Sequence, residues 1–301
     1  MMRDKSNPII LVHGIARFDV MWLWLLSFIH RRVTRLDRFF DRLSYFRNVA
    51  STLRAHGYDV TSARLSFAAG VELCALELKT QVLDALQRSD ARKVIIIAHS
   101  MGGLVARRMI VELGMDQYVS ALATIGTPHN GTSFADWGKV NRGDVLIKWL
   151  HKYIDLSGFL DLTTEACARF NEGAFHTEAS NDVRYIAVAA SEERAGIVYP
   201  LQRPYDIIKD RQGENDGLVP VSSQLWQPFL ISLNGESKLV ARYEFSFPAD
   251  HFNECGWWDR RERKARARFE GHVLDAYVEL AELCCAHDIG LRALRVRPML
   301  T

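Results

Sequence analysis

One stretch of this sequence constrains the fold more than any other: an apolar run that stops at a serine and continues at once as a helix. Residues 93–98 read Lys-Val-Ile-Ile-Ile-Ala, which is typical of a strand buried on both faces of a parallel sheet. The sequence His-Ser-Met-Gly-Gly follows at 99–103, and residues 104–113 have the apolar spacing of a helix. A strand, a sharp turn and a helix in this order predict an α/β fold.

Apolar runs alternate with amphipathic stretches along most of the chain, which is the pattern of a mostly parallel sheet with helices on both faces. Strands are predicted at residues 9–12, 58–63, 93–98, 119–125, 183–190 and 242–247. Helices are predicted at residues 45–56, 71–88, 104–113 and 259–285. No internal repeat or linker composition interrupts this order, so we expect a single α/β domain over residues 1–301.

Two stretches stand outside this alternation and are predicted as insertions. The first, about residues 18–47, contains six arginines and an apolar stripe at helical spacing. It fits either a helix packed on its own domain or a helix lying on an anionic lipid interface. The second, about residues 133–180, is far longer than a usual connection of roughly 2–6 residues. An apolar helical face within it predicts a lid or cap.

The balance of charge disfavours nucleic acid as a partner. The 38 Lys and Arg residues against 36 Asp and Glu residues leave a formal net charge of +2, which is too small to create a strong global field. A basic run at 260–268 lies on the predicted terminal helix, and no aromatic residues that could stack on bases alternate with it. We interpret that run as a solvated helix face and expect no nucleic-acid partner.

Cysteine usage and the N-terminus indicate a reducing compartment. The chain has five cysteines, an odd number, and no Cys-x-x-Cys pair. Residues 1–8 lead directly into the first predicted strand, without the apolar segment and cleavage site of a signal peptide. The longest apolar stretch, at 21–29, is about half as long as a membrane-spanning helix. We therefore expect a cytoplasmic protein.

The turn at Ser100 has the context of a nucleophile elbow, in which a strand, a turn and a helix lift a serine hydroxyl above the sheet. Ala98 and Gly102 are small, and we expect the sharp turn to require this because larger side chains beside the serine would collide. The backbone N–H of Met101 would lie at the positive end of the following helix. A serine that only caps a helix would explain Ser100 but not His99 and Gly102 around it.

A serine nucleophile needs a base, and that base needs an acid that holds its tautomer. Asp216 lies in an Asn-Asp-Gly turn after the fifth predicted strand, and His251 follows the end of the sixth. The chain order Ser100, Asp216, His251 is the order of the α/β-hydrolases. Two other acids are weaker candidates: Asp250 is too close to His251 in sequence to orient it, and Glu214 lacks the turn geometry.

An attacked ester carbonyl also needs hydrogen-bond donors for its negative oxygen. His13, Gly14 and Ile15 follow the first predicted strand, and the glycine lets the backbone turn so that the Ile15 N–H faces the serine beside the Met101 N–H. Each such donor typically lowers the barrier by about 3–4 kcal/mol. We expect His13 and His99 to hydrogen-bond locally. No histidine shows metal-ligand spacing, so no metal site is predicted.

Five motifs occur in an order that resembles the bacterial triacylglycerol lipases of the α/β-hydrolase superfamily. They are Pro-Ile-Ile-Leu-Val-His-Gly-Ile at 8–15, Ala-His-Ser-Met-Gly-Gly at 98–103, Thr-Ile-Gly-Thr-Pro-His-Asn-Gly-Thr at 124–132, Asn-Asp-Gly-Leu-Val-Pro at 215–220 and Asp-His-Phe-Asn at 250–253. The resemblance implies that Ser100 is the nucleophile, Asp216 the acid and His251 the base. It implies Ile15 and Met101 as the oxyanion donors.

The chain departs from these lipases in ways that bear on cofactors and export. Several relatives hold a structural Ca²⁺ with an aspartate two residues after the histidine of the triad, whereas this chain has Asn253 there. A neutral ligand weakens a site for a hard cation, so calcium is left open and is not predicted. The tail also lacks the glycine–aspartate repeats that accompany leaderless export.

Together these features predict a serine carboxylic-ester hydrolase, a lipase or esterase that acts through an acyl-enzyme on Ser100 without a cofactor. The expected partner is a small-molecule ester or lipid, with transient contact to a lipid interface through the lid. An acyltransferase or thioesterase with the same triad remains an alternative. A hydrolase-fold protein that binds a lipid or another protein without turnover is a further alternative. The oligomeric state is not indicated.

Overall fold

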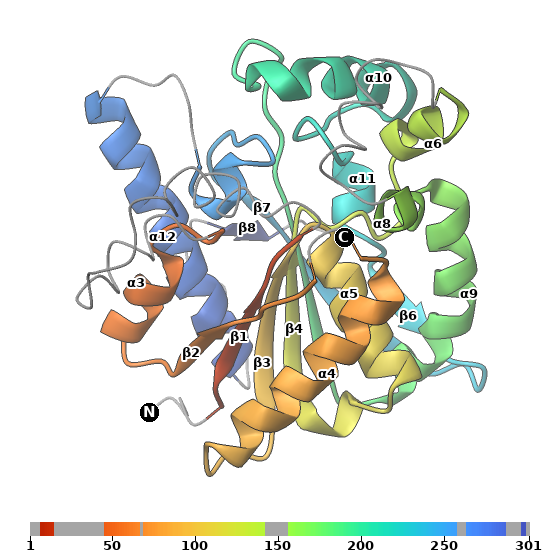
Figure 1. The fold of residues 1–301 in the computed structure, drawn as a ribbon, viewed down its shortest axis with the longest axis vertical. Helices are drawn as coiled ribbons and strands as arrows, with labels where there is room; N and C mark the ends of the chain where they lie inside the picture. The colour runs from red at the N-terminus through yellow and green to blue at the C-terminus, as the bar shows by residue number, and fades with distance from the viewer. Residues whose placement is uncertain are drawn as a thin grey trace.

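The computed structural model places a central sheet between two layers of helices (Figure 1). It describes residues 7–14, 45–66, 69–141, 156–257, 263–286 and 296–298. The sheet has eight strands in the order β2-β1-β3-β4-β5-β7-β6, and β8 pairs with β7. The strands are β1 (Ile9–Val12), β2 (Val60–Ser62), β3 (Val94–His99), β4 (Val119–Ile125), β5 (Arg184–Ala189), β6 (Phe229–Ile231), β7 (Ser237–Phe245) and β8 (Val296–Pro298).

Six of these strands run parallel, and only β6 and β8 pair antiparallel with β7. Side chains alternate between the two faces of β1, so that Ile9 and Leu11 enter one core and Ile10 and Val12 enter the other. Both faces are buried, which is why the strands read as continuous apolar runs. The predicted α/β fold with a mostly parallel sheet is confirmed.

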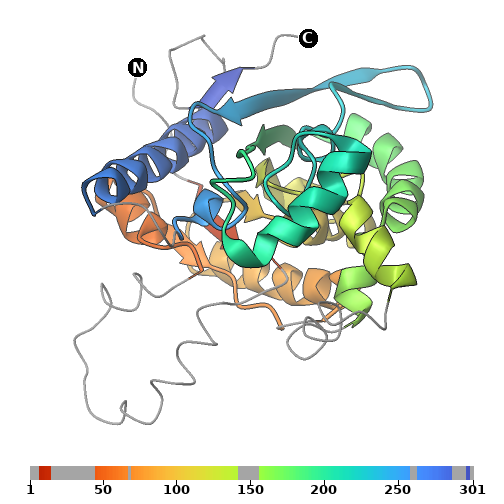
Figure 2. The ribbon, with the colours of Figure 1, turned by 90° about the horizontal axis from the view of Figure 1, so that it is seen from above.

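The helices divide between the two faces and the upper edge of the sheet. Helices α3 (Val49–Ala55) and α12 (Arg263–Cys285) pack on one face, and α4 (Val71–Gln87), α5 (Met101–Glu112) and α9 (Thr164–Ser180) cover the other (Figure 1). The remaining α-helices are α6 (Ser133–Val140), α8 (Leu156–Leu160), α10 (Gln202–Gln212) and α11 (Val221–Gln224). Of these, α10 and α6 lie above the carboxyl ends of the parallel strands, as the view from above shows (Figure 2).

The predicted elements match the observed ones best where both faces are buried. The strands predicted at 9–12 and 119–125 have those bounds, and the helix predicted at 71–88 ends one residue earlier. The predicted start of the strand at 242–247 is wrong, because β7 already begins at Ser237 and forms an antiparallel hairpin with β6. The helix predicted at 45–56 begins only at Val49, because Asn48 takes a left-handed conformation with φ 58°.

The two predicted insertions are described to different extents. Of the first, about residues 18–47, only residues 45–47 are described, so the prediction of a helix there lies outside the described residues. Of the second, about residues 133–180, the structure describes α6, α8 and α9, whereas residues 142–155 lie outside the described part.

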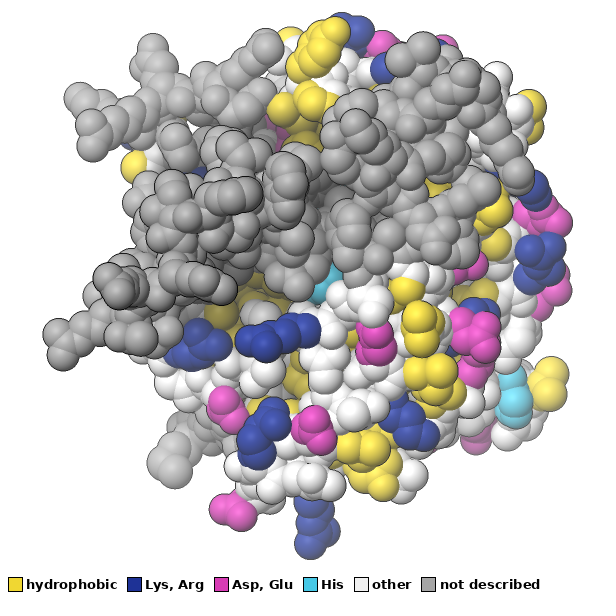
Figure 3. Space-filling model, in the orientation of Figure 1, with side chains coloured by type: hydrophobic (Ala, Val, Ile, Leu, Met, Phe, Trp, Pro, Cys, Tyr) yellow, Lys and Arg dark blue, Asp and Glu magenta, His cyan; other side chains and the backbone are white. Residues whose placement is uncertain are grey.

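Charge on the outside of the molecule is mixed in sign. Among the described residues on the face that α4 and α9 cover, acidic and basic side chains are interspersed (Figure 3). The described helices also include none whose length and apolar content would let it cross a bilayer.

One buried ion pair connects the helix that follows Ser100 to the second insertion. Arg107 on α5 donates from Nε to Glu178 on α9 at 2.7 Å, and both side chains are fully buried. The same guanidinium donates to Asn171 at 2.9 Å and lies 3.9 Å from the ring centre of Trp226. Buried charges need such partners, because an unpaired charge in the interior is strongly unfavourable. The pair therefore ties α9 to α5.

We expect Glu178→Ala to lower the free energy of unfolding by about 3–5 kcal/mol, because it leaves the Arg107 guanidinium buried without its carboxylate. Glu165→Ala is the matched control on the same helix. Glu165 pairs with Lys139 and Arg169 at the surface, so its loss should change the free energy of unfolding far less than the loss of Glu178. Urea denaturation of both variants measures the difference, and equal losses would contradict the argument.

Candidate active site

Ser100 occupies a strained turn between β3 and α5. Its backbone has φ 57° and ψ −135°, a left-handed region that costs a non-glycine residue about 1–3 kcal/mol. Two hydrogen bonds hold the turn: the Ser100 N–H donates to the carbonyl of Ile125 at 2.9 Å, and Thr127 Oγ1 donates to the Ser100 carbonyl at 2.8 Å. The turn has the geometry that the sequence predicts for a nucleophile elbow.

Two glycines after Ser100 allow α5 to approach its neighbours closely. A Cβ on Gly102 would lie 2.6 Å from the carbonyl oxygens of both Val12 and His13 at the end of β1. A Cβ on Gly103 would lie 2.2 Å from Thr127 Oγ1. Small residues are predicted beside Ser100 because larger side chains flanking the serine would collide. For Gly102 the obstacle is instead the backbone at the end of β1.

The structure brings Ser100, His251 and Asp216 together from three loops. His251 Nε2 lies 2.9 Å from Ser100 Oγ, and His251 Nδ1 lies 2.8 Å from Asp216 Oδ2. All three residues are buried. The His251 backbone N–H also donates to the Asp216 carbonyl at 2.9 Å, so both the backbone and the side chain of His251 are bonded to Asp216. The arrangement permits a proton to move from the serine to the imidazole.

Backbone amides orient the Asp216 carboxylate. Oδ1 accepts hydrogen bonds from the backbone N–H groups of Leu218 and Val219, both at 2.7 Å, and Oδ2 accepts from Gln224 Nε2 at 3.2 Å. Gly217 within this turn has φ 100°, which glycine adopts readily. The predicted Asn-Asp-Gly turn thus aims Oδ2 at His251.

Asp250 and Glu214, the two weaker candidates for the acid, do not face His251. Asp250 accepts hydrogen bonds from the backbone N–H groups of Val198, Phe252 and Asn253, and its burial raises its pKa to about 6. Glu214 is exposed. Neither carboxyl faces the His251 ring, whereas Asp216 does.

A second carboxyl group, from Glu254, lies behind the triad and was not predicted. Glu254 Oε2 is 2.8 Å from His99 Nε2 and 3.6 Å from His251 Nδ1. His99 Nδ1 in turn bonds the Tyr45 hydroxyl at 2.7 Å. The expectation that His99 bonds locally was wrong, because its partners are 54 and 155 residues away in the chain. His13 bonds locally through Nδ1 to the Gly14 carbonyl at 2.8 Å, whereas its Nε2 accepts from the distant Leu65 N–H at 3.4 Å.

Burial shifts the pKa values of Glu254 and His99. Complete burial, and then the Asp216 carboxylate beside it, raise the pKa of Glu254 well above its ordinary value. Burial also lowers the pKa of His99 well below its ordinary value. Burial therefore favours the protonated carboxyl group of Glu254 and the neutral imidazole of His99. Glu254 lies three residues after His251, on the short 3₁₀ helix Asn253–Cys255, and this spacing is the signal in the sequence that could have found it.

His99, His251 and Glu254 are also residue types that bind metal ions. Ligand atoms of His99, His251 and Glu254 all lie within 4.8 Å of one another. Each of these atoms already lies within hydrogen-bond distance of a protein partner. Asn253 bonds the Trp257 carbonyl at 2.7 Å rather than presenting a free ligand. The absence of a metal or other cofactor remains a prediction.

One part of the predicted oxyanion hole is described. Met101 is the first residue of α5, where backbone N–H groups have no partner within the helix. Gly14 lies against the serine, since a Cβ on it would be 2.7 Å from Ser100 Cβ and 3.1 Å from Ser100 Oγ. Ile15, the other predicted donor, lies outside the described residues.

Several known proteins are similar to this chain in sequence. Residues 70–151 match the PGAP1-like alpha/beta domain family. A triacylglycerol lipase of Pseudarthrobacter phenanthrenivorans is 35% identical over 133 residues, which cover 43% of this chain and 35% of that lipase. Triacylglycerol lipase 2 of Saccharomyces cerevisiae is 26% identical over 317 residues, covering 93% of this chain and 91% of that protein. The chain has the α/β-hydrolase fold and is similar in sequence to triacylglycerol lipases.

A solved structure supports the same fold for this α/β-hydrolase. The mature Bacillus licheniformis lipase BlEst2 superposes with a TM-score of 0.59 at 18% identity, over 84% of this chain and 87% of that one. The predicted α/β-hydrolase fold is thereby confirmed. The chain spans about a third of the length of the Pseudarthrobacter lipase and of a Burkholderia plantarii lipase.

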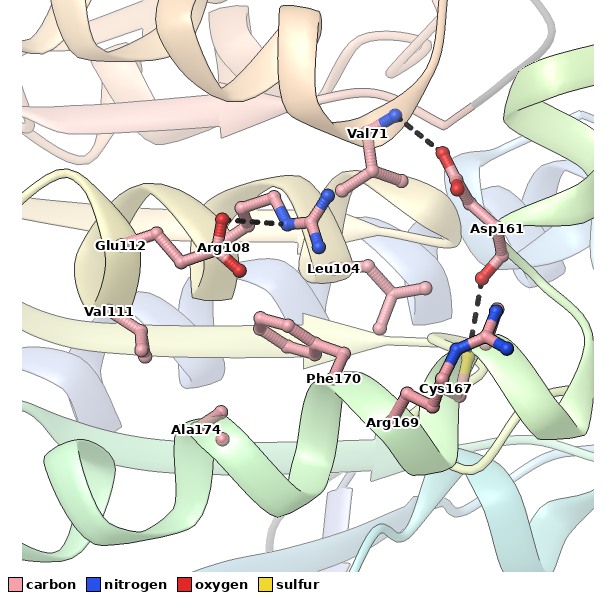
Figure 4. Close-up of a pocket in the computed structure, with 12 residues that line it drawn as sticks. Val71, Leu104, Arg108, Val111, Glu112, Asp161, Cys167, Arg169, Phe170 and Ala174 are labelled. Carbon is pink, nitrogen blue, oxygen red and sulfur yellow. Dashed lines mark hydrogen bonds and ion pairs between the residues drawn. The ribbon is translucent and has the colours of Figure 1, made fainter.

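A pocket of about 350 Å³ in this α/β-hydrolase lies apart from the triad (Figure 4). It is bounded by α4, α5 and α9, and Leu104 and Phe170 contribute apolar surface. Its charged side chains are already engaged: Arg108 pairs with Glu112 at 3.1 Å, and Asp161 accepts from the Val71 N–H at 2.8 Å.

We expect Gly102→Ala to lower the free energy of unfolding by about 1–3 kcal/mol, because the added methyl overlaps two carbonyl oxygens of β1. Gly173→Ala on α9 is the matched control, since its Cβ would enter open space and helical alanine is more stable than glycine by about 1 kcal/mol. Urea denaturation should show opposite signs for the two variants. Equal effects would show that α5 does not depend on this close approach.

The raised pKa of Glu254 predicts a pH dependence. A carboxyl group whose pKa is raised on folding favours the folded state below its unfolded pKa, about 4.5, and this contribution is lost as the pH rises through the folded pKa. The stability of the wild type relative to Glu254→Gln should therefore fall with rising pH, by at most about 1.4 kcal/mol per pH unit. Urea denaturation at pH 5, 7 and 9 tests this, and a relative stability that rises with pH is the contrary result.

Proposed function

We propose that this chain is a serine carboxylic-ester hydrolase of the lipase and esterase type, with Ser100 as nucleophile, His251 as base and Asp216 as acid. The observation that carries the proposal is the continuous hydrogen-bonded path from Ser100 Oγ through both ring nitrogens of His251 to Asp216 Oδ2. Its position at the turn between a parallel strand and a helix supports the same role.

The reaction follows from the direction of these bonds. His251 Nε2 takes the hydroxyl proton as Ser100 Oγ attacks the ester carbonyl carbon, and Asp216 stabilises the imidazolium that forms. The tetrahedral oxyanion lies beside the Met101 N–H at the start of α5. His251 then gives the proton to the leaving alcohol, which leaves an acyl group on Ser100. Water activated by His251 releases the acid and restores the hydroxyl.

The class of substrate is proposed from the relatives. The Pseudarthrobacter and Saccharomyces proteins carry the name triacylglycerol lipase, which supports an ester or lipid substrate for this chain. The acyl-enzyme would be common to ester hydrolysis, thioester hydrolysis and acyl transfer, and the relatives favour ester hydrolysis. The five cysteines are free thiols, which supports the predicted reducing, cytoplasmic location.

We expect a fluorophosphonate to label the wild type at Ser100, because the probe needs a serine activated by its base. Ser100→Ala should lose the label and lower kcat for a p-nitrophenyl ester by about 10⁴- to 10⁶-fold, with folding intact. Ser180→Ala, which changes an exposed hydroxyl at the end of α9, is the control and should keep both. Mass spectrometry of labelled peptides locates the adduct, and labelling at another serine would refute the assignment.

A series of p-nitrophenyl esters from acetate to palmitate then separates the two subclasses. Highest kcat/KM on long acyl chains supports a lipase, and highest kcat/KM on acetate or butyrate supports a short-chain esterase. A wild type that hydrolyses none of these esters and takes no label overturns the proposed function.

A further inference from the structure

Tyr45 brings a hydroxyl group to the same small space that Ser100 faces. The point that a Cβ on Gly14 would occupy is 2.9 Å from the Tyr45 hydroxyl oxygen and 3.1 Å from Ser100 Oγ. Both hydroxyls therefore border Gly14, the glycine of the predicted oxyanion loop. A carbonyl group attacked by Ser100 would place its oxygen on the side of the serine where backbone donors gather, next to this glycine.

The Tyr45 side chain is held firmly in that position. It is buried, and its ring packs edge-on against Phe46 at 5.1 Å and against the His13 and His99 rings at 5.6 Å. Trp257 Nε1 donates to the Tyr45 carbonyl at 2.9 Å, which anchors its backbone to the segment that follows His251. A donor fixed before the reaction needs no reorganisation when negative charge develops.

Two arrangements of protons satisfy the chain from Tyr45 through His99 to Glu254. In the first, the Tyr45 O–H donates to His99 Nδ1, and His99 Nε2–H donates to Glu254. In the second, protonated Glu254 donates to Nε2 and His99 Nδ1–H donates to the Tyr45 oxygen, so that the Tyr45 O–H bond points away from His99. The raised pKa of Glu254 and the lowered pKa of His99 keep both groups neutral, so the second arrangement introduces no buried charge.

We propose that Tyr45 is a further oxyanion donor, whose hydroxyl hydrogen-bonds the negative oxygen that forms when Ser100 attacks the ester carbonyl. The proposal rests on the proposed function, because that oxygen exists only if Ser100 attacks. His99 and Glu254 are positioning residues in this scheme: Glu254 donates to His99 Nε2, and His99 Nδ1–H donates to the Tyr45 oxygen, so that the Tyr45 O–H is directed toward the oxyanion. In this second arrangement no proton is transferred when the oxyanion forms, and the Tyr45 hydroxyl only donates a hydrogen bond to it.

The experiment compares Tyr45→Phe with the wild type in steady-state hydrolysis of a p-nitrophenyl ester. Loss of one oxyanion donor lowers kcat by about 100-fold and leaves KM within about twofold, because the donor acts in the transition state. A boronic acid that forms a tetrahedral adduct on Ser100 should bind more weakly by a similar factor. Tyr185→Phe is the matched control, since Tyr185 is a buried tyrosine whose hydroxyl bonds Asn181, and it should keep kcat within twofold.

A second measurement covers the case in which Tyr45→Phe folds poorly. Site-specific replacement of Tyr45 by 3,5-difluorotyrosine retains the ring and the hydroxyl but makes the phenol more acidic. The donor is lost when this phenol ionises, so kcat should fall at high pH where the wild type remains active. Thermal denaturation of each variant at both pH values separates loss of the donor from loss of the fold.

Each outcome bears on one of the two proposals. Unchanged kcat in Tyr45→Phe, together with inactivation by Ser100→Ala, overturns the role of Tyr45 and leaves the proposed function standing. A fall in kcat with unaltered boronic-acid affinity assigns Tyr45 a structural role and also overturns it. A wild type without esterase activity or label overturns the proposed function itself, and the role of Tyr45 with it.

Discussion

The approach of α5 to β1 is the contact on which the rest of the site depends. Gly102 places the start of the helix so close to the carbonyl oxygens of Val12 and His13 that no side chain fits between them. This contact brings three features together at one point: the strained turn of Ser100, the amino end of α5 and the loop that contains Gly14. A helix further from the sheet would separate the hydroxyl from the backbone amides that an oxyanion requires.

The two carboxyl groups near His251 have different surroundings, and this gives them different tasks. Asp216 accepts two backbone N–H bonds on one oxygen and faces His251 with the other. Glu254 is fully buried, and one of its oxygens has no hydrogen-bond partner among the described residues. Burial, and then the Asp216 carboxylate nearby, raise the pKa of Glu254 and favour its protonated form as the partner of His99. Environments that separate two acids in this way are typical of acid–base sites.

The site is also coupled to the helices around it. Arg107 lies two turns after Ser100 on α5, and its buried bonds to Glu178 and Asn171 hold the helix against α9. His129, in the loop after β4, stacks on Trp226 at 4.5 Å and approaches the same guanidinium. The loops at the carboxyl edge of the sheet thus lie on a buried polar network, which favours one arrangement of the site.

The sequence by itself determined the parallel sheet, the elbow and the three residues of the triad, because each depends on local signals. Buried strands are continuous apolar runs, and a serine between a strand and a glycine-rich helix start has few other conformations open to it. Tertiary structure alone decided that Tyr45, His99 and Glu254 form a second chain of hydrogen bonds behind the triad. The sequence around Tyr45 and His99 does not predict their hydrogen-bond partners. A buried polar side chain bonds the groups that lie within about 3 Å of it, and here those groups come from distant segments of the chain.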